Sequence, residues 1–432
     1  MKMLIDEAID YLDRHINRRL TLEKIDGLSL EHMVSLLEAI GDPQRDFPMI
    51  HVTGTNGKGS TAAMISGLLN SLGLTVGTYS SPHVSSITER IQIRKEPISE
   101  EDFAEAVSVL SLVELDLGFS PSWFELVTAA AFRCFADSAV DVAVVEVGML
   151  GRFDATNVGD PVVSVITNIG YDHTDGEEGW QRKLAWEKAG IIRETGDLCL
   201  GVIDDELDDI FTAENPKQIY RRDNDFLCEE NELALGGRQL TLRSQTEVYE
   251  DLFLPLHGEH QGNNASIALS AAEAFVGTAL PYEIVQSGLE DIYLPGRFEI
   301  LRNSPLLIVD GAHNPPGAEA ALTTLEKSFR IDGKRILIIG MTQEKNAEWM
   351  TDCLKVDEAD LIICTQVAAQ RAMPADVLAN VIQHVASDVK ICKNPEDALE
   401  LAMSAAEDRD VILATGSLYV AGAIRDAYLS SA

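Results

Sequence analysis

Residues 51–60 read HVTGTNGKGS, a glycine-rich turn that carries a single lysine. The mostly apolar residues 48–52 before it predict a short buried strand, and residues 60–74 after it predict a helix with apolar side chains at helical spacing. Glycines let backbone N–H groups approach phosphate oxygens closely, and a helix start adds unpaired N–H donors. We therefore interpret the stretch as a phosphate-binding loop rather than an ordinary turn with an exposed lysine. The expected nucleotide contacts are Gly54, Thr55, Asn56, Gly57, Lys58, Gly59 and Ser60.

The loop lacks a metal-binding hydroxyl directly after its lysine, because Gly59 stands at that position. A metal ligand must therefore come from elsewhere, and ligands of parallel sheets gather beyond the carboxyl ends of strands. Glu146 ends the apparent strand 140–147, and His173 follows the apparent strand 162–169. Facing a triphosphate, this pair would make a Mg²⁺ site, although histidine is a softer ligand than Mg²⁺ prefers. The alternatives are a satisfied buried glutamate and a helix-capping Asp-His pair.

The composition restricts the class of protein. The chain has 432 residues, enough for two or three domains, with 46% hydrophobic and 24% charged residues. A net charge of −36 argues against a nucleic-acid partner and requires anionic ligands to be captured by local positive sites. Residues 1–20 do not read as a signal peptide, and no apolar run is long enough to span a bilayer. Six scattered cysteines without a C-x-x-C pair favour a reducing cytoplasm.

The periodicity predicts two α/β domains. Two amphipathic helices open the chain, and from residue 50 onward apolar strands alternate with helices, which is typical of a parallel sheet. Residues 225–256 change to short alternating segments that predict a small β region. A boundary at Pro295-Gly296 gives an expected phosphate-loop domain over 1–296 and a smaller Rossmann-like α/β domain over 297–432.

Two further motifs permit more than one interpretation. Asp310 and His313 follow the strand 306–309, while Asn314 and Pro315 fit a helix-capping turn, and both roles are compatible. Lys188 lies near the end of a predicted helix, where lysines are usually solvated, and nothing in the composition singles it out.

Taken together, the motifs resemble the folylpolyglutamate synthase and dihydrofolate synthase family, relatives of the Mur peptide ligases. The resemblance spans nearly the whole chain in the right order. The matching segments are HVTGTNGKGS (51–60), SSPHVSSITERI (80–91), EVGMLGRFDATN (146–157), TNIGYDHT (167–174), EKAGII (187–192), GEHQGNNA (258–265), GRFE (296–299), DGAHNP (310–315) and ATGSLY (414–419).

The resemblance implies a Mur-ligase-like fold, with a phosphate-loop ATPase domain and a smaller Rossmann-like domain. It also implies roles for individual residues, each of which is an expectation here. Two Mg²⁺ ions would be bound by Ser81, Glu146, His173 and a carbamylated Lys188. Gln261 and Asn264 would contact adenine, and Asp310 the ribose. Arg297, His313 and Ser417 would serve the phosphates or the incoming glutamate, and Asp154 would face the pterin.

The implied reaction is an ATP-dependent amide ligation in the cytoplasm by a monomer. L-glutamate would be added to dihydropteroate, to the γ-carboxylate of a reduced folate, or to both, through an acyl phosphate. Lys58, His173 and Lys188 would be the catalytic residues. Leu150 replaces a glycine that the family usually has, and the segment after His173 also departs from its pattern, which affects the expected shape of the pterin site.

Four alternatives stay open at this point. The chain could carry only the folate-extending activity, or it could be a cell-wall Mur ligase, against which the pterin-type segment 151–157 argues. A GTPase-type switch would need an N-K-x-D segment, which the sequence lacks. A nucleotide-binding protein without turnover would not need Lys58, Glu146, His173 and Lys188 together.

Overall fold

The computed structural model describes residues 3–16, 29–172, 174, 176–368 and 371–431 of the 432-residue chain. The chain packs as two compact units. The first consists of residues 1–231, 239–254 and 262–292, and the second of residues 232–238, 255–261 and 293–432. Each unit is described by itself below.

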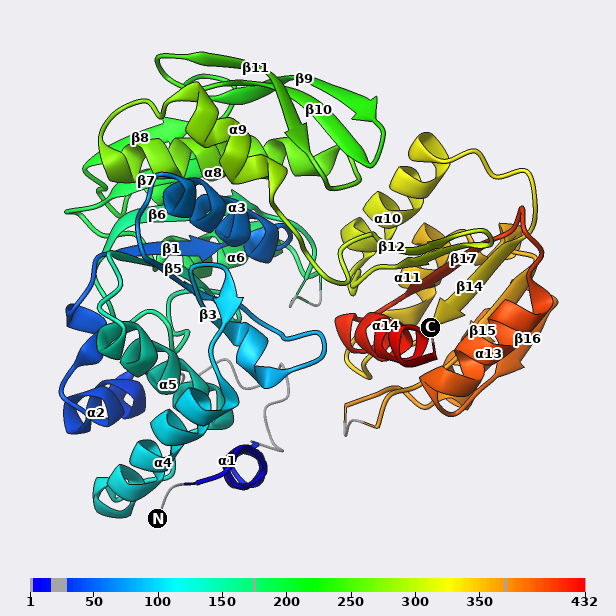
Figure 1. Cartoon of the computed structure of the whole chain (residues 1–432), viewed down its shortest axis with the longest axis horizontal. Coiled ribbons are helices and arrows are strands. Elements are labelled where there is room, and N and C mark those ends of the chain that lie inside the picture. The colour runs from blue at the N-terminus through cyan, green and yellow to red at the C-terminus, as the bar shows by residue number, and fades with distance from the viewer. Residues whose placement is uncertain (1–2, 17–28, 173, 175, 369–370, 432) are drawn as a thin grey trace. The chain divides into compact units, whose positions relative to one another are not determined.

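The first unit is built on an eight-stranded sheet with the order β4-β3-β2-β5-β1-β6-β7-β8 (Figure 1). The six strands from β2 to β8 in this order pair in parallel, and β3 and β4 form an antiparallel edge. The parallel sheet predicted from the apolar runs is therefore confirmed. The strands are β1 (Met49–Thr53), β2 (Val76–Tyr79), β3 (Ile91–Ile93), β4 (Glu96–Pro97), β5 (Val142–Glu146), β6 (Pro161–Asn168), β7 (Asp197–Val202) and β8 (Gln218–Arg221).

Helices cover both faces of this sheet (Figure 1). Helices α1, α2, α4 and α5 bury a large apolar cluster against β1, β2 and β5, and α6 and α7 pack against β6 and β7. Helices α3 and α9 pack closely against each other at Gly67 and Gly288. A β-carbon at Gly288 would lie 2.8 Å from the Cα of Leu68, so the contact leaves no room for a side chain there. The helices are α1 (Ile5–Asp13), α2 (Glu31–Ala39), α3 (Lys58–Ser71), α4 (Glu100–Leu117), α5 (Trp123–Asp137), α6 (Trp180–Ala189), α7 (Asp208–Thr212), α8 (His260–Val276) and α9 (Tyr282–Glu290), with short 3-10 helices at Pro43–Arg45, Ile87–Arg90 and Asp205–Leu207.

The predicted small β region is a three-stranded sheet with the order β11-β10-β9. Its strands are β9 (Leu227–Ala234), β10 (Gly237–Arg243) and β11 (Val248–Leu254). Gly236 takes a left-handed conformation (φ +80°) in the tight turn between β9 and β10, where glycine carries no steric penalty.

The second unit contains a six-stranded sheet with the order β12-β13-β17-β14-β15-β16, which is parallel except for the edge strand β12. Helices α10, α11 and α12 bury one face, and α13 and α14 bury the other (Figure 1). The strands are β12 (Glu299–Asn303), β13 (Leu306–Val309), β14 (Arg335–Ile339), β15 (Leu361–Cys364), β16 (Val389–Ile391) and β17 (Val411–Thr415), and the helices are α10 (Pro315–Ser328), α11 (Ala347–Cys353), α12 (Ala375–Ile382), α13 (Pro395–Ala405) and α14 (Leu418–Ser431), with a 3-10 helix at Val356–Glu358. The Rossmann-like prediction is confirmed. None of the described helices in either unit has the length and apolar character needed to cross a bilayer.

Candidate active site

The predicted phosphate loop connects β1 to α3 at the carboxyl edge of the first sheet. Two of its glycines have left-handed backbone, Gly54 at φ +152° and Gly57 at φ +80°. A β-carbon at Gly54 would lie 1.8 Å from Oγ1 of Thr167, and one at Gly57 would lie 2.4 Å from Oδ1 of Asn264. Only glycine satisfies both the backbone conformation and the space at these two positions. Gly57 is also the N-cap of α3, so the loop leads directly into a helix N-terminus.

The end of β6 and the residues just after it hold the loop by hydrogen bonds. The N–H of Asn56 donates to Oδ1 of Asn168 (3.0 Å), and the hydroxyl of Thr167 donates to the carbonyl of Asn56 (2.6 Å). The hydroxyl of Thr55 donates to the carbonyl of Gly170 (3.1 Å) and accepts from its N–H (2.9 Å). Thr167 and Asn168 were not among the predicted site residues. Their position, directly at the carboxyl end of a strand beside the loop, is the sequence signal that could have identified them.

Two lysines from distant parts of the chain converge on one carbonyl of the loop. Nζ of Lys58 donates to the carbonyls of Gly54 (3.1 Å) and Thr55 (3.0 Å). Nζ of Lys188, from α6, also donates to the carbonyl of Gly54 (2.9 Å). Lys188 is buried, and burial together with the charge of Lys58 lowers its pKa from 10.5 to about 7. The expectation of a solvated helical lysine is therefore wrong.

Close backbone packing brings Lys188 to this position. A β-carbon at Gly151 would lie 2.8 Å from the carbonyl of Glu187 and 3.1 Å from the Cα of Lys188. The N–H of Arg152 donates to the same Glu187 carbonyl (2.7 Å). Gly151 therefore lets the segment after β5 lie directly on the end of α6. This contact joins two motifs that are far apart in the sequence.

Glu146 and Ser81 lie together beside the phosphate loop. The N–H of Ser81 donates to Oε2 of Glu146 (2.8 Å), and a β-carbon at Gly59 would lie 3.4 Å from the same oxygen. Glu146 is the last residue of β5 and is 3% exposed. His173 lies outside the described residues, and no described group of three or more His, Cys, Asp and Glu side chains is arranged to hold a metal ion. The described part of the site thus places the Glu146 carboxylate next to the loop, with Ser81 bonded to it through its backbone N–H. Carboxylate and hydroxyl oxygens are ligand types that hard cations prefer.

Asp154 organises the turn that follows Gly151. Its Oδ2 accepts from the N–H of Met149 (2.8 Å), and its Oδ1 accepts from the N–H (3.0 Å) and the hydroxyl (2.6 Å) of Thr156. Burial raises the pKa of the Asp154 carboxyl. Leu150 adopts a left-handed conformation (φ +62°) at the position where the family usually has glycine, and its carbonyl accepts from the hydroxyl of Thr53 (2.7 Å). The turn therefore keeps a shape suited to glycine despite the side chain.

The two residues expected at adenine both lie in the first turns of α8 and are buried, Gln261 at 3% and Asn264 at 6% exposure. The side chain of Asn264 packs against Gly57 of the phosphate loop. The amide of Asn264 is thereby close to any nucleotide that the loop binds.

In the second unit, the turn after β13 carries the DGAHNP motif. Oδ2 of Asp310 accepts from the N–H of Phe298 (2.9 Å), and Oδ1 accepts from the N–H of Ala312 (2.9 Å). Oδ1 of Asn314 accepts from the N–H of Gly317 (2.9 Å), which confirms the predicted N-cap of α10. Arg297 belongs to the preceding GRFE motif, and its Nη1 would lie 3.0 Å from a β-carbon at Gly311.

The two remaining predicted residues of this unit also lie just beyond strand ends. His313 follows Ala312 in the same turn and is partly buried, and its Nδ1 lies 3.2 Å from the carbonyl of Gly311. Ser417 follows β17 and is 5% exposed, and its Oγ accepts from the N–H of Val420 (3.1 Å) at the start of α14. Arg297, Asp310, His313 and Ser417 thus cluster at the carboxyl edge of the second sheet, because β13 and β17 are parallel neighbours.

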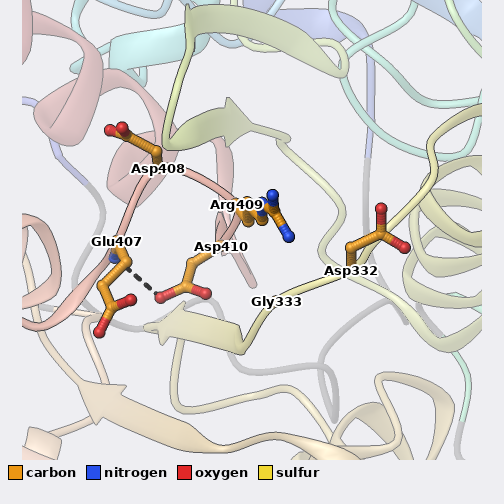
Figure 2. A pocket seen from close by; sticks show the side chains of 6 residues that line it. All are labelled: Asp332, Gly333, Glu407, Asp408, Arg409 and Asp410. Carbon is orange, nitrogen blue, oxygen red and sulfur yellow. Dashed lines mark hydrogen bonds between the residues drawn. The ribbon is translucent and has the colours of Figure 1, made fainter.

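A hollow of about 590 Å³ lies at the opposite, amino edge of the same sheet (Figure 2). Its lining is dominated by carboxylates, and Asp410 uses its own oxygens to accept from the N–H groups of Glu407 (2.8 Å) and Lys334 (2.7 Å). Because nucleotides bind at the carboxyl ends of parallel strands and are repelled by carboxylates, this hollow is not part of the active site. It is lined by Asp332, Gly333, Glu407, Asp408, Arg409 and Asp410.

Comparison with known families and proteins identifies the chain. The family model of the Mur ligase middle domain matches residues 124–272, and that of the Mur ligase glutamate ligase domain matches residues 296–418. The dihydrofolate synthase/folylpolyglutamate synthase of Mycobacterium tuberculosis is 36% identical over 438 residues, which cover 92% of this chain and 89% of the relative.

Solved structures of folylpolyglutamate synthases superpose closely on this chain. The Mycobacterium tuberculosis folylpolyglutamate synthase complexed with ADP and AMPPCP superposes with a TM-score of 0.91 at 34% identity, covering 98% of each chain. A bifunctional folylpolyglutamate synthase/dihydrofolate synthase with Mn, AMPPNP and L-glutamate bound superposes with a TM-score of 0.84 at 28% identity, again over 98% of each chain. The chain therefore belongs to the folylpolyglutamate synthase/dihydrofolate synthase family of the Mur ligase superfamily, and it is an ATP-dependent ligase.

Proposed function

We propose that this chain joins L-glutamate to dihydropteroate and to the γ-carboxylate of reduced folates, at the expense of ATP. The acceptor carboxylate attacks the γ-phosphorus of ATP and ADP leaves; the amine of glutamate then attacks the acyl carbon and phosphate leaves. The observation that carries the proposal is the convergence of Lys58 and the buried Lys188 on the carbonyl of Gly54. Lys58 supplies positive charge at this point, which stabilises the negative charge of a phosphoryl group in transfer, and Lys188 is close enough to take part in the same site.

The proposal assigns nucleotide contacts to residues of the phosphate loop, of α8 and of the segment from Arg297 to Asp310. Residues 54–60 and the start of α3 hold the phosphates, with Lys58 as the cation, and Asn264 and Gln261 contact adenine. In the second unit, Asp310 contacts the ribose and Arg297 the phosphates. Support for the role of the loop is the close packing at Gly54 and Gly57, where a β-carbon would collide with Thr167 and Asn264.

We further propose Mg²⁺ as the physiological metal, held by Ser81, Glu146, His173 and a carbamylated Lys188. Support for the fit is the Glu146 carboxylate, which lies beside Gly59 of the loop and accepts from the backbone N–H of Ser81. When bound, the metal neutralises phosphate charge. Lys188 becomes an oxygen ligand only after its neutral amine adds CO₂ and releases one proton, and the lowered pKa of about 7 supplies that neutral amine near physiological pH.

The acceptor and the glutamate have separate proposed contacts. Asp154 faces the pterin of the acceptor. It belongs to the turn that it holds next to Gly151 and Lys188. His313 and Ser417 act on the incoming glutamate, and their support is a shared position at the carboxyl edge of the second sheet. The working form is a monomer in the cytoplasm.

The deciding experiment measures phosphate release from ATP with each acceptor, together with mass spectrometry of the products. Purified protein with Mg²⁺ and glutamate receives dihydropteroate, a reduced folate monoglutamate or a UDP-linked muramyl acceptor in parallel. We expect release only with the first two, and products heavier by one glutamate residue. Activity with the folate alone restricts the function to polyglutamylation. Activity with the muramyl acceptor alone contradicts the proposal.

A metal titration tests the ligand assignment separately. Glu146→Ala removes one carboxylate ligand, so the Mg²⁺ concentration for half-maximal activity should rise, because phosphate oxygens alone hold the ion less tightly. Asp141→Ala is the control. Asp141 is also a carboxylate next to β5, but it lies at the amino end of the strand, where it accepts a hydrogen bond from the N–H of Thr75. An unchanged half-saturation point for Glu146→Ala means that the metal lies elsewhere.

A further inference from the structure

Arg297 lies between two residues with left-handed backbone. Gly296 has φ +67° and Phe298 has φ +48°. Glycine adopts this conformation freely, whereas a phenylalanine there is strained. The surrounding structure must therefore hold the backbone around Arg297 against this strain.

The N–H of Arg297 itself donates to the carbonyl of Leu294 (3.2 Å), and three further hydrogen bonds hold the residues on either side of it. The N–H of Gly296 donates to Oε2 of Glu299 (2.8 Å), and its carbonyl accepts from the N–H of Gly311 (2.8 Å). The N–H of Phe298 donates to Oδ2 of Asp310 (2.9 Å). The residues on both sides of Arg297 are thus fixed by carboxylates, one from its own motif and one from the turn after β13.

The first of these carboxylates is itself held by α14. Nε of Arg425 donates to both oxygens of Glu299 (3.1 and 3.0 Å), and the hydroxyl of Tyr293 donates to Oε1 (2.6 Å). Nη2 of Arg425 closes the ring by donating to the Tyr293 hydroxyl (2.9 Å). The side chains of Glu299 and Arg425 are only 10% and 17% exposed, so water screens this ion pair weakly.

The guanidinium of Arg297 is left available by this arrangement. It lies against Gly311, beside the turn that carries Asp310 and His313. Among the described residues, none accepts a hydrogen bond from the guanidinium, although Arg297 is only partly exposed. A cation with a fixed backbone and unused donors is prepared for an anionic ligand.

We propose that Glu299, fixed in place by Arg425, is a positioning residue for Arg297. Its carboxylate holds the left-handed backbone at Gly296, and the guanidinium is thereby held beside Gly311, ready for an anionic ligand, before ATP arrives. This inference rests on the proposed phosphate-binding role of Arg297. It assigns a function to the last residue of the GRFE motif and to a helix outside the phosphate-binding segments.

A double-mutant cycle tests this inference through the KM for ATP. Glu299→Gln removes the charge, and Arg425→Met removes the partner that fixes it. Each should raise the KM for ATP about tenfold in the wild-type background, because a misdirected guanidinium loses its phosphate contact. In an Arg297→Met background, neither should raise it further. If Glu299 and Arg425 serve only general stability, each substitution should change the KM for ATP by the same factor in both backgrounds. That result would overturn the inference.

Asp410→Asn is the matched control. Asp410 is also a buried carboxylate of the second unit that accepts backbone N–H groups, but it lies at the amino edge of the sheet (Figure 2). The Asp410→Asn variant should have a lower melting temperature and an unchanged KM for ATP. If Arg297→Met leaves that KM unchanged, the proposed role of Arg297 is wrong and the inference falls with it. If Arg297→Met raises it and Glu299→Gln and Arg425→Met do not, only the positioning role is wrong.

Discussion

Lys58 already donates hydrogen bonds to two carbonyls of its own loop, at Gly54 and Thr55, so its ammonium is directed across the loop. Lys58→Ala should reduce kcat/KM by about 100-fold or more, since it removes the charge that meets the phosphoryl group in the transition state. The melting temperature should change little, because Lys58 is only partly buried. Steady-state ATP consumption beside a thermal melt decides the matter. A variant with activity within a few-fold of wild type would sink the catalytic assignment.

Lys188 gives a prediction about pH and CO₂. Burial and the neighbouring Lys58 lower its pKa to about 7, so about half of the amines are neutral at pH 7 and about one tenth at pH 6. Carbamylation consumes the neutral amine. After CO₂ is removed, added bicarbonate should therefore restore activity at pH 8 and progressively less as the pH falls through 7. An ordinary lysine would place the midpoint near 10.5 instead.

Lys188→Ala is the control for that experiment. It should be strongly impaired and should no longer respond to bicarbonate, and a short carboxylic acid such as acetate should restore part of the rate by occupying the space of the missing carbamate. A bicarbonate effect that persists in Lys188→Ala shows that the effect arises at another group. Wild-type activity of Lys188→Ala would falsify its catalytic role.

The loop between β1 and α3 gives a prediction for a whole element. Gly57→Ala introduces a β-carbon 2.4 Å from Oδ1 of Asn264 at φ +80°, whereas Gly73→Ala, just beyond the other end of α3, meets no atom within 4 Å at φ +97°. Both variants carry backbone strain of about 1–2 kcal/mol. Gly57→Ala should melt at a lower temperature than Gly73→Ala, and it alone should raise the KM for ATP, by at least about tenfold. Equal KM values for the two variants would mean that the shape of the loop does not govern nucleotide binding.

Most elements could be predicted from the sequence because their signals are local. The apolar run 162–169 corresponds to β6, and the Asn314-Pro315 pair caps α10 as expected. The position of Lys188 could not be predicted, since it depends on the close approach that Gly151 allows between segments separated in sequence. The position of Asn168 at the end of a strand could be predicted, but its contact with the loop appears only once β1 and β6 are paired. The individual roles of the predicted site residues stay predictions until the variants are measured.

At the scale of the whole molecule, the net charge of −36 gives a prediction about salt. Mutual repulsion among carboxylates destabilises the compact state, and raising the ionic strength from about 0.1 M to 1 M shortens the screening length from about 10 Å to 3 Å. The melting temperature should therefore rise in 1 M KCl. Differential scanning fluorimetry across a KCl series measures it. A melting temperature that falls or stays constant means that surface repulsion contributes nothing to stability at low salt.

The division of the chain has a consequence for how the protein can be cut. The backbone passes between the units five times, at residues 231/232, 238/239, 254/255, 261/262 and 292/293. A protease that cleaves one of these passages divides the linear chain into two pieces, of which at least one carries segments of both units, so the halves stay together only through the noncovalent packing within each unit. A truncated chain that begins at residue 297 lacks the segments 232–238 and 255–261, which pack with the second unit. The two halves are thus inseparable as gene fragments, even though each is organised around its own sheet.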